Sequence, residues 1–87
     1  MNRSIKIPEN ITFESIDENI YILNIDDGEY YELSKSASEI WNQIEKGVDI
    51  KDIKLNLKSS FENNENIDYD VDELITYFIN VGLLKDN

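Results

Sequence analysis

Cysteine and histidine are both absent from the 87 residues of this chain. Without cysteine there are no disulfides and no thiolate metal sites. Without histidine the chain lacks the usual general base, proton shuttle and nitrogen ligand for metals. These two absences exclude most nucleophilic triads and most zinc chemistry. The sequence therefore predicts no catalytic residues, no metal site and no cofactor.

Positive charge is scarce as well, with 8 Lys and Arg residues against 19 Asp and Glu residues and a net charge of −11. Affinity for nucleic acids rests on basic residues that neutralise phosphates, so we expect no nucleic-acid partner. An anionic membrane surface would also be repelled, whereas a basic partner would be attracted. No apolar run is long enough for a signal peptide or a membrane span, which favours a cytoplasmic protein without a membrane partner.

Proline and glycine are few, with one Pro and three Gly residues, and no repeat or linker is visible. The sequence therefore predicts one domain over residues 1–87. One small core leaves little room for a deep cavity. A functional surface is expected to be a groove or a sheet edge.

The first third of the chain predicts an antiparallel sheet. Residues 11–15 alternate apolar and polar side chains, and residues 20–25 are apolar almost throughout, as in a central strand. The pair Asp27-Gly28 indicates a hairpin, because glycine accepts positive φ without strain. The partner strand, residues 29–33, has Tyr31 and Leu33 on one face and Tyr30 and Glu32 on the other.

Three helices are predicted to follow. The first begins at Ser36, with Glu39 at the spacing of a capping box, and ends at Gly47. The second begins near Asp49 and has an apolar face, formed by Ile50, Ile53, Leu57 and Phe61. Another face carries a lysine row, formed by Lys51, Lys54 and Lys58.

The third helix is predicted after a loop over residues 62–69. It begins near Asp70, with Glu73 at the box spacing, and ends at Gly82, where Leu83 folds back on Phe78. The predicted fold class is α+β, with a three-stranded antiparallel sheet followed by three α-helices on one side of it. That inventory is the one found in a winged helix-turn-helix.

Several groups of side chains allow a plain and a functional interpretation. The acidic residues before and within the start of the third helix have the spacing of a calcium loop, but Glu73 and Ile79 stand where such a loop needs Gly and Glu. Capping and the helix dipole explain them better. The lysine row is typical of a solvated helix face, and Trp41 belongs to the core stripe of the first helix.

The candidate functional surface is the strand at residues 29–33 together with the third helix. An edge strand offers unpaired backbone groups to which an extended peptide can add as another strand. A groove between strand and helix would expose Tyr77 and part of Leu74 or Phe78. The plain alternative is an edge protected by Glu29 and Glu32 beside a helix that only packs.

Three segments in this order resemble the PqqD-like family. The run Asp27 to Ser34, DGEYYELS, resembles its third strand, residues 37–41, ASEIW, resemble its first helix, and residues 81–84, VGLL, resemble its ending. The resemblance covers about residues 10–84. It implies a peptide-recognition domain, also called an RRE, for ribosomally made and post-translationally modified peptides (RiPPs), with a winged helix-turn-helix-like fold.

The resemblance also implies a function. Such domains are not enzymes: they bind the leader of a precursor peptide by strand addition and present it, as a peptide chaperone, to a radical S-adenosylmethionine enzyme or a leader peptidase. Carried over to this chain, the contact strand is Glu29 to Leu33 and the groove helix is Asp70 to Val81. The expected leader-binding residues are Glu29, Tyr30, Tyr31, Glu32, Leu33, Leu74, Tyr77 and Phe78.

Other interpretations stay open at this level. A winged-helix transcription regulator shares the topology, a regulatory subunit could use the same edge for another protein, and a small enzyme could use Asp or Glu. The exposed edge could also pair two copies into a homodimer. The acidity of the chain leads to the further hypothesis that its leader is rich in Lys or Arg.

Overall fold

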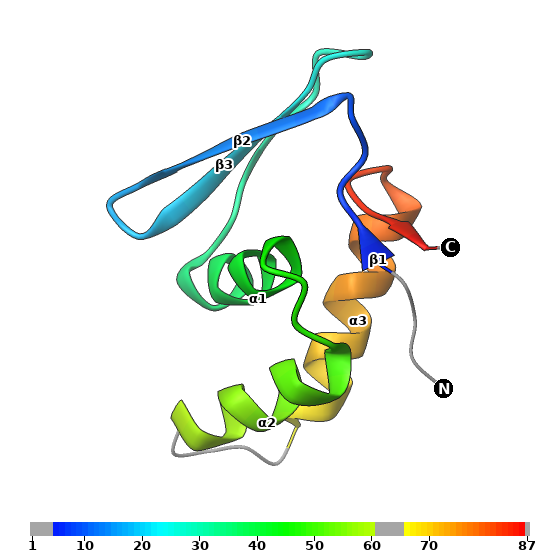
Figure 1. The fold of residues 1–87 in the computed structure, drawn as a ribbon. Coiled ribbons are helices and arrows are strands. Elements are labelled where there is room, and N and C mark those ends of the chain that lie inside the picture. The colour runs from blue at the N-terminus through cyan, green and yellow to red at the C-terminus, as the bar shows by residue number, and fades with distance from the viewer. Residues whose placement is uncertain (1–4, 61–65, 87) are drawn as a thin grey trace.

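The computed structural model describes residues 5–60 and 66–86 of the chain (Figure 1). A three-stranded antiparallel sheet is followed by three helices, which confirms the predicted α+β architecture. The elements in chain order are β1 (Ile5–Lys6), β2 (Ile11–Ile16), β3 (Asn19–Asn24), β4 (Tyr30–Glu32), α1 (Lys35–Glu45), α2 (Ile50–Ser60), α3 (Ile67–Asn80) and β5 (Lys85–Asp86).

The main sheet has the order β2-β3-β4, so β3 is central, as its apolar sequence predicts. Ile22 is paired with Phe13 of β2 and with Tyr31 of β4. Gly28 closes the β3–β4 hairpin with φ of 74°, and its N–H donates to the carbonyl of Asn24 at 2.8 Å. The hairpin predicted at Asp27-Gly28 is therefore confirmed.

Helix α1 begins earlier than predicted. The N-cap is Ser34, whose Oγ accepts a hydrogen bond from the N–H of Ala37 at 3.3 Å, so the capping box assigned to Ser36 and Glu39 is wrong. Both serines satisfy the sequence rule for a cap, but only Ser34 retains extended backbone, with ψ of 169°. Gly47, with φ of 83°, follows the helix as predicted.

Helix α2 begins directly after Asp49, as expected, whereas Phe61 of its predicted apolar face lies outside the described residues. Helix α3 begins at Ile67 rather than near Asp70. Part of the predicted loop is therefore helix, and the rest of it lies largely outside the described residues. Asp70 is inside the helix and does not cap it; the N-cap position is Asn66, which makes no side-chain capping bond.

The end of α3 has the predicted Schellman geometry. The N–H of Gly82 donates to the carbonyl of Ile79 at 3.1 Å, and the N–H of Leu83 donates to that of Phe78 at 2.8 Å. Leu83 is fully buried. This turn directs the chain into β5, which pairs antiparallel with β1. The two ends of the described chain therefore lie side by side (Figure 1).

The core lies between the sheet and the helices and is built around Trp41, as its place in the stripe of α1 predicts. Its ring meets Phe13 and Phe78 edge-on, each with ring centroids 5.4 Å apart. The Oγ of Ser38 in α1 accepts a hydrogen bond from the N–H of Ile20 in β3 at 2.9 Å, which joins helix to sheet. Among the described residues, no helix is long and apolar enough to cross a lipid bilayer.

Candidate functional site

Strand β4 forms one edge of the sheet. The carbonyl of Glu29 and the N–H of Leu33 are bonded to β3, to Asn24 and Ile20 respectively. Backbone groups alternate in direction along an antiparallel strand, so Tyr31 also faces β3. The N–H and C=O groups of Tyr30 and Glu32 therefore point outward, and no backbone group of the described residues is bonded to them. An extended chain has four backbone groups available here.

Side chains of β4 alternate between the two faces of the sheet as predicted. Tyr31 and Leu33 point to the helical side, where Tyr31 is half-buried and Leu33 is buried. Tyr30 and Glu32 are exposed on the opposite face. In the predicted contact strand, the backbone groups of Tyr30 and Glu32 are thus available at the sheet edge. The side chain of Tyr31 points to the side of the sheet on which α3 lies.

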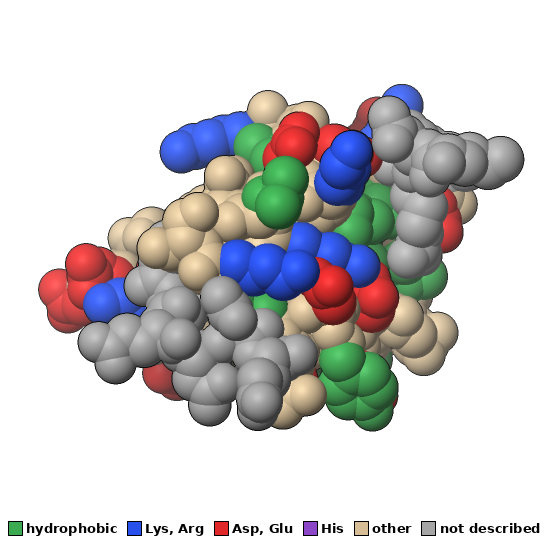
Figure 2. All heavy atoms as spheres, turned by 90° about the horizontal axis from the view of Figure 1, so that it is seen from below, with side chains coloured by type: hydrophobic (Ala, Val, Ile, Leu, Met, Phe, Trp, Pro, Cys, Tyr) green, Lys and Arg blue, Asp and Glu red, His purple; other side chains and the backbone are tan. Residues whose placement is uncertain are grey.

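One flank of α3 is held against α2. The ammonium of Lys54 lies 2.9 Å from a carboxylate oxygen of Asp72, and that of Lys58 lies 3.0 Å from one of Asp68. Figure 2 shows lysine side chains beside acidic ones on the face seen from below. Two of the three residues of the lysine row are thus engaged within the fold rather than only solvated.

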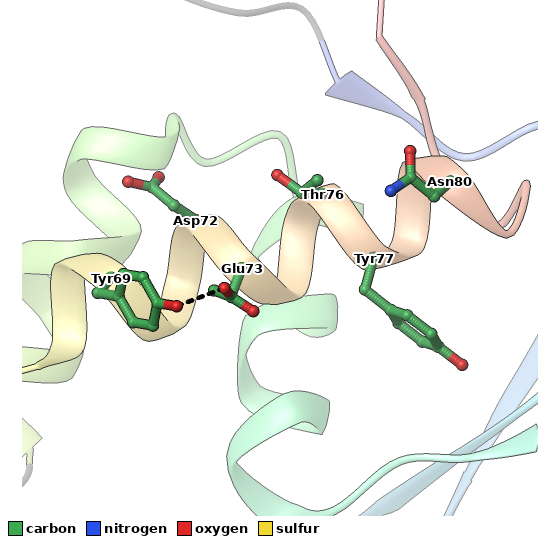
Figure 3. Close-up of a pocket in the computed structure, with 6 residues that line it drawn as sticks. All are labelled: Tyr69, Asp72, Glu73, Thr76, Tyr77 and Asn80. Atoms are coloured by element: carbon green, nitrogen blue, oxygen red, sulfur yellow. Dashed lines mark hydrogen bonds between the residues drawn. The ribbon is translucent and has the colours of Figure 1, made fainter.

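The other flank of α3 carries Asp70, Leu74 and Tyr77, which share one face at intervals of four and three residues. Figure 3 shows Tyr77 and Asp72 projecting from different sides of the helix. Tyr77 is 48% exposed and Leu74 is partly buried. This flank is directed away from α2.

Two neighbouring tyrosines indicate that this flank of α3 faces β4. Burial raises the pKa of Tyr31, and the next contributions come from Glu29 and from Tyr77. This agrees with Tyr31 of β4, which is half-buried on the helical side of the sheet, lying on the side toward Tyr77 of α3. We call β4 and the residues Asp70, Leu74 and Tyr77 the strand–helix groove.

Two open hollows follow the exposed side of α3. One of about 350 Å³ is lined by Tyr69, Asp70, Glu73, Leu74 and Tyr77. A second of about 410 Å³ is lined by Tyr69, Asp72, Glu73, Thr76, Tyr77 and Asn80 (Figure 3). The hydroxyl of Tyr69 donates to Glu73 at 2.6 Å, and this bond raises the pKa of Tyr69. The lining combines aromatic rings with carboxylates, a surface suited to a chain with apolar and basic side chains.

The sequence-based site residues separate into two groups. Leu74 is partly exposed and Tyr77 is exposed, whereas Leu33 is buried and Phe78 is completely buried. Tyr77 and part of Leu74 are thus at the surface, whereas Phe78 belongs to the core. That Leu74 and Tyr77 contact a leader stays a prediction. Tyr69 was missed, because the helix was expected to begin after it. The spacing of Ile67, Val71 and Ile75 could have found the true start.

The site carries no arrangement typical of a catalytic or metal centre. No group of three potential metal ligands occurs among the described residues, and two of the acidic side chains near the start of α3 are paired with lysines. Helix α3 contains neither Lys nor Arg, which does not favour a DNA-recognition helix. What the geometry offers is an open strand edge beside a partly apolar helix flank.

Comparisons with known proteins agree with this architecture. The family model described as "Coenzyme PQQ synthesis protein D (PqqD)" matches residues 19–84. The solved structure described as "TbiB1 in Complex with the TbiA(beta) Leader Peptide" has a TM-score of 0.86 and 22% identity, covering 92% of this chain and 94% of that one. "Lasso peptide synthetase B1 complexed with the leader peptide" has the same TM-score and identity, covering 94% and 98%. No curated protein matches.

Proposed function

The chain belongs to the PqqD family, and from this premise we propose that it binds the leader segment of a ribosomally made precursor peptide. The leader adds as a strand to β4 and lies in the strand–helix groove. The domain itself does no chemistry and uses no cofactor. Its work is to raise the concentration of the precursor at a modifying enzyme or leader peptidase.

The observation that carries the proposal is the open edge of β4 together with the flank of α3 that is directed away from α2. Tyr30 and Glu32 direct backbone groups outward. Leu74 and Tyr77 offer apolar surface next to that edge. A peptide added there gains backbone hydrogen bonds from the strand and side-chain burial from the helix, which are the two parts of strand-addition recognition.

The similar structures support leader binding as the function. Both are described as complexes with a leader peptide. Their likeness to this chain extends over almost the whole fold. The radical S-adenosylmethionine enzyme or leader peptidase expected from the family resemblance is the partner that we propose for the bound precursor.

The energetics require both parts of the site. Ordering a flexible peptide costs several kcal/mol. Each backbone hydrogen bond contributes only about 0.5–1.5 kcal/mol net, so four bonds at the β4 edge leave little surplus. Burying an apolar side chain adds about 1.5–3 kcal/mol. The groove beside Leu74 and Tyr77 therefore has to supply the anchors that give useful affinity.

The test uses the synthetic leader of the short precursor encoded nearest to this gene, with a scrambled peptide as control. Nuclear magnetic resonance of the complex is expected to give inter-strand contacts to Tyr30 and Glu32 and slower exchange of their two amide protons. The scrambled peptide should give neither. A leader that binds without protecting these amides contradicts strand addition, and the absence of binding contradicts the function. Binding of a different protein at β4 would instead favour the regulatory-subunit alternative.

A further inference from the structure

Within residues 5–60 and 66–86, no helix covers the outer face of the main sheet. All three helices lie on the other side of β2, β3 and β4 (Figure 1). Ile20 and Ile22 of β3 are buried on the helical side. Alternation therefore places Tyr21 and Leu23 of β3, and Tyr30 of β4 opposite Leu23, on the uncovered face. Leu23 is 39% exposed and Tyr30 is 63% exposed. Both side chains therefore point away from the helical side of the sheet, although the backbone of Tyr30 belongs to the edge of the strand–helix groove.

These side chains form a continuous apolar surface. Leu23 stands directly opposite Tyr30 in the strand register. The rings of Tyr21 and Tyr30 have centroids 6.1 Å apart. Ile25 continues the alternation of β3, because its N–H still donates to Asn10 at 2.9 Å, and its side chain is 60% exposed. We call Tyr21, Leu23, Ile25 and Tyr30 the outer patch.

Acidic side chains surround the outer patch. Glu14 of β2 and Glu32 of β4 are the two cross-strand neighbours of Tyr21, and both are exposed. Asp26 and Asp27 follow Ile25 directly in the hairpin turn. The outward-facing side chains of β2, β3 and β4 include no Lys or Arg. The pKa of Tyr21 is raised, with Glu32 as the largest cause, which agrees with a negative potential here.

We propose that the outer patch is a second docking surface, which receives the enzyme acting on the bound precursor through an apolar area of that enzyme rimmed by Lys and Arg. An exposed apolar patch with a polar rim is typical of a protein interaction site. A rim in which Glu14, Glu32, Asp26 and Asp27 supply the charge selects a basic counterpart. A second copy of this chain is disfavoured, because two surfaces of a protein with net charge −11 would bring like charges together.

The location of the patch also connects it with the proposed leader site, on which this inference rests. A strand added to β4 extends the sheet beyond Tyr30. Every second side chain of that strand then points to the outer face, beside the patch, while the others point to α3. An enzyme docked on the patch would contact the domain and the outward side chains of the leader together. Docking would therefore be tighter with the leader in place.

The experiment compares wild-type protein with the double variant Leu23→Thr/Ile25→Thr, which removes apolar area and places a β-branched residue, favourable in strands, at both positions. The matched control is Leu55→Gln, because Leu55 is 53% exposed on α2, away from the sheet. The probes are the purified modifying enzyme or leader peptidase encoded beside this gene and the synthetic leader. Leader affinity is measured by fluorescence anisotropy, and enzyme affinity by biolayer interferometry with and without leader.

The double variant is expected to bind the leader within twofold of wild type and the enzyme at least tenfold more weakly, while Leu55→Gln changes neither. Unchanged enzyme affinity, or an equal loss in the control, overturns the proposal. A parallel loss of leader binding would assign the patch to the leader site, and dimerisation abolished by the double variant would assign it to a second copy. Wild-type protein that binds leader but not enzyme refutes only this inference, whereas failure to bind leader refutes the proposed function.

Discussion

Phe78 meets the ring of Trp41 edge-on, with centroids 5.4 Å apart, while its neighbour Tyr77 projects into the strand–helix groove. One is completely buried and the other is half exposed, although they are adjacent in the chain. A helix turns by about 100° per residue, so consecutive positions can serve the core and the surface separately. Folding and peptide binding can therefore be perturbed independently at this point of α3.

Tyr77→Ala is expected to weaken leader binding at least tenfold while leaving the fold intact. The exposed ring contributes little to the core, but it is the largest apolar surface of the groove flank. Anisotropy titration with the labelled leader measures the affinity, and circular dichroism melting measures the fold. A folded variant with wild-type affinity would remove α3 from the proposed binding site.

Phe78→Ala is expected to lower the free energy of unfolding by about 3–5 kcal/mol, because it leaves a cavity beside Trp41. Domains of this size are only marginally stable, so much of the variant should be unfolded at 37 °C. Urea denaturation followed by Trp41 fluorescence measures the loss. A stable Phe78→Ala variant with impaired leader binding would mean that Phe78 contacts the peptide after all.

The outward N–H of Glu32 allows a test of strand addition itself. Glu32→Pro removes this donor, and proline is tolerated at a sheet edge where the N–H faces away from the neighbouring strand. Leader affinity is expected to fall at least tenfold. Glu32→Ala keeps the N–H and serves as the matched control, with less than threefold loss expected. Equal affinity of the two variants in the anisotropy assay would argue against backbone pairing at β4.

The contribution of Tyr77 to the pKa of Tyr31 has a consequence at high pH. The pKa of Tyr31 is raised above its ordinary value of 10.0, first by burial and then by Glu29 and Tyr77. The native state thus holds this proton more tightly than the unfolded chain, so the associated stability is present below pH 10 and is lost as pH rises through the raised pKa. In a titration of ¹³C-labelled tyrosine, Tyr77→Phe is expected to lower the Tyr31 midpoint. An unshifted midpoint would mean that Tyr77 does not affect the ionisation of Tyr31.

Local patterns of the sequence predict most of the elements. The period of two at 11–15 and 29–33, and the stripe around Trp41, reflect burial on one face, which is a local property of each segment. The Gly28 hairpin and the Gly82 ending are also predicted from local sequence. Both positions have positive φ, which favours glycine, and a glycine is visible in the sequence. The surface position of Tyr77 and of part of Leu74 could be predicted because the third helix carries more apolar side chains than one core contact needs.

The errors concern features that depend on distant parts of the chain. The pairing of Ile5–Lys6 with Lys85–Asp86 joins two-residue strands from opposite ends, and such short segments carry no periodic signal of their own. The choice between Ser34 and Ser36 as cap depends on how the chain leaves the sheet after Leu33. The engagement of Lys54 by Asp72 depends on the packing of α2 against α3, which neither helix encodes alone.

The acidity of the groove leads to the last prediction, that the leader is basic and that its affinity decreases with salt. Asp70 and Glu73 line the same hollow as Tyr69 and Tyr77, so a Lys or Arg side chain could place its stem on the rings and its charge at the carboxylates. Exposed charge pairs are screened within about 8 Å at physiological ionic strength. The leader dissociation constant is therefore expected to rise several-fold between 20 and 500 mM NaCl.

The double variant Asp70→Asn/Glu73→Gln should bind the leader more weakly at low salt and show a shallower dependence on NaCl. Lys51→Gln is the control for a charge change outside the groove, because Lys51 is exposed on α2. It removes one positive charge, whereas the double variant removes two negative charges. Removal of Lys51 makes the protein more acidic, so any long-range effect on a basic leader is a slight strengthening. Isothermal titration at three salt concentrations measures both slopes. If leader affinity is independent of salt for both wild type and the double variant, the basic-leader hypothesis is wrong. Recognition would then rest on backbone pairing and apolar contacts alone.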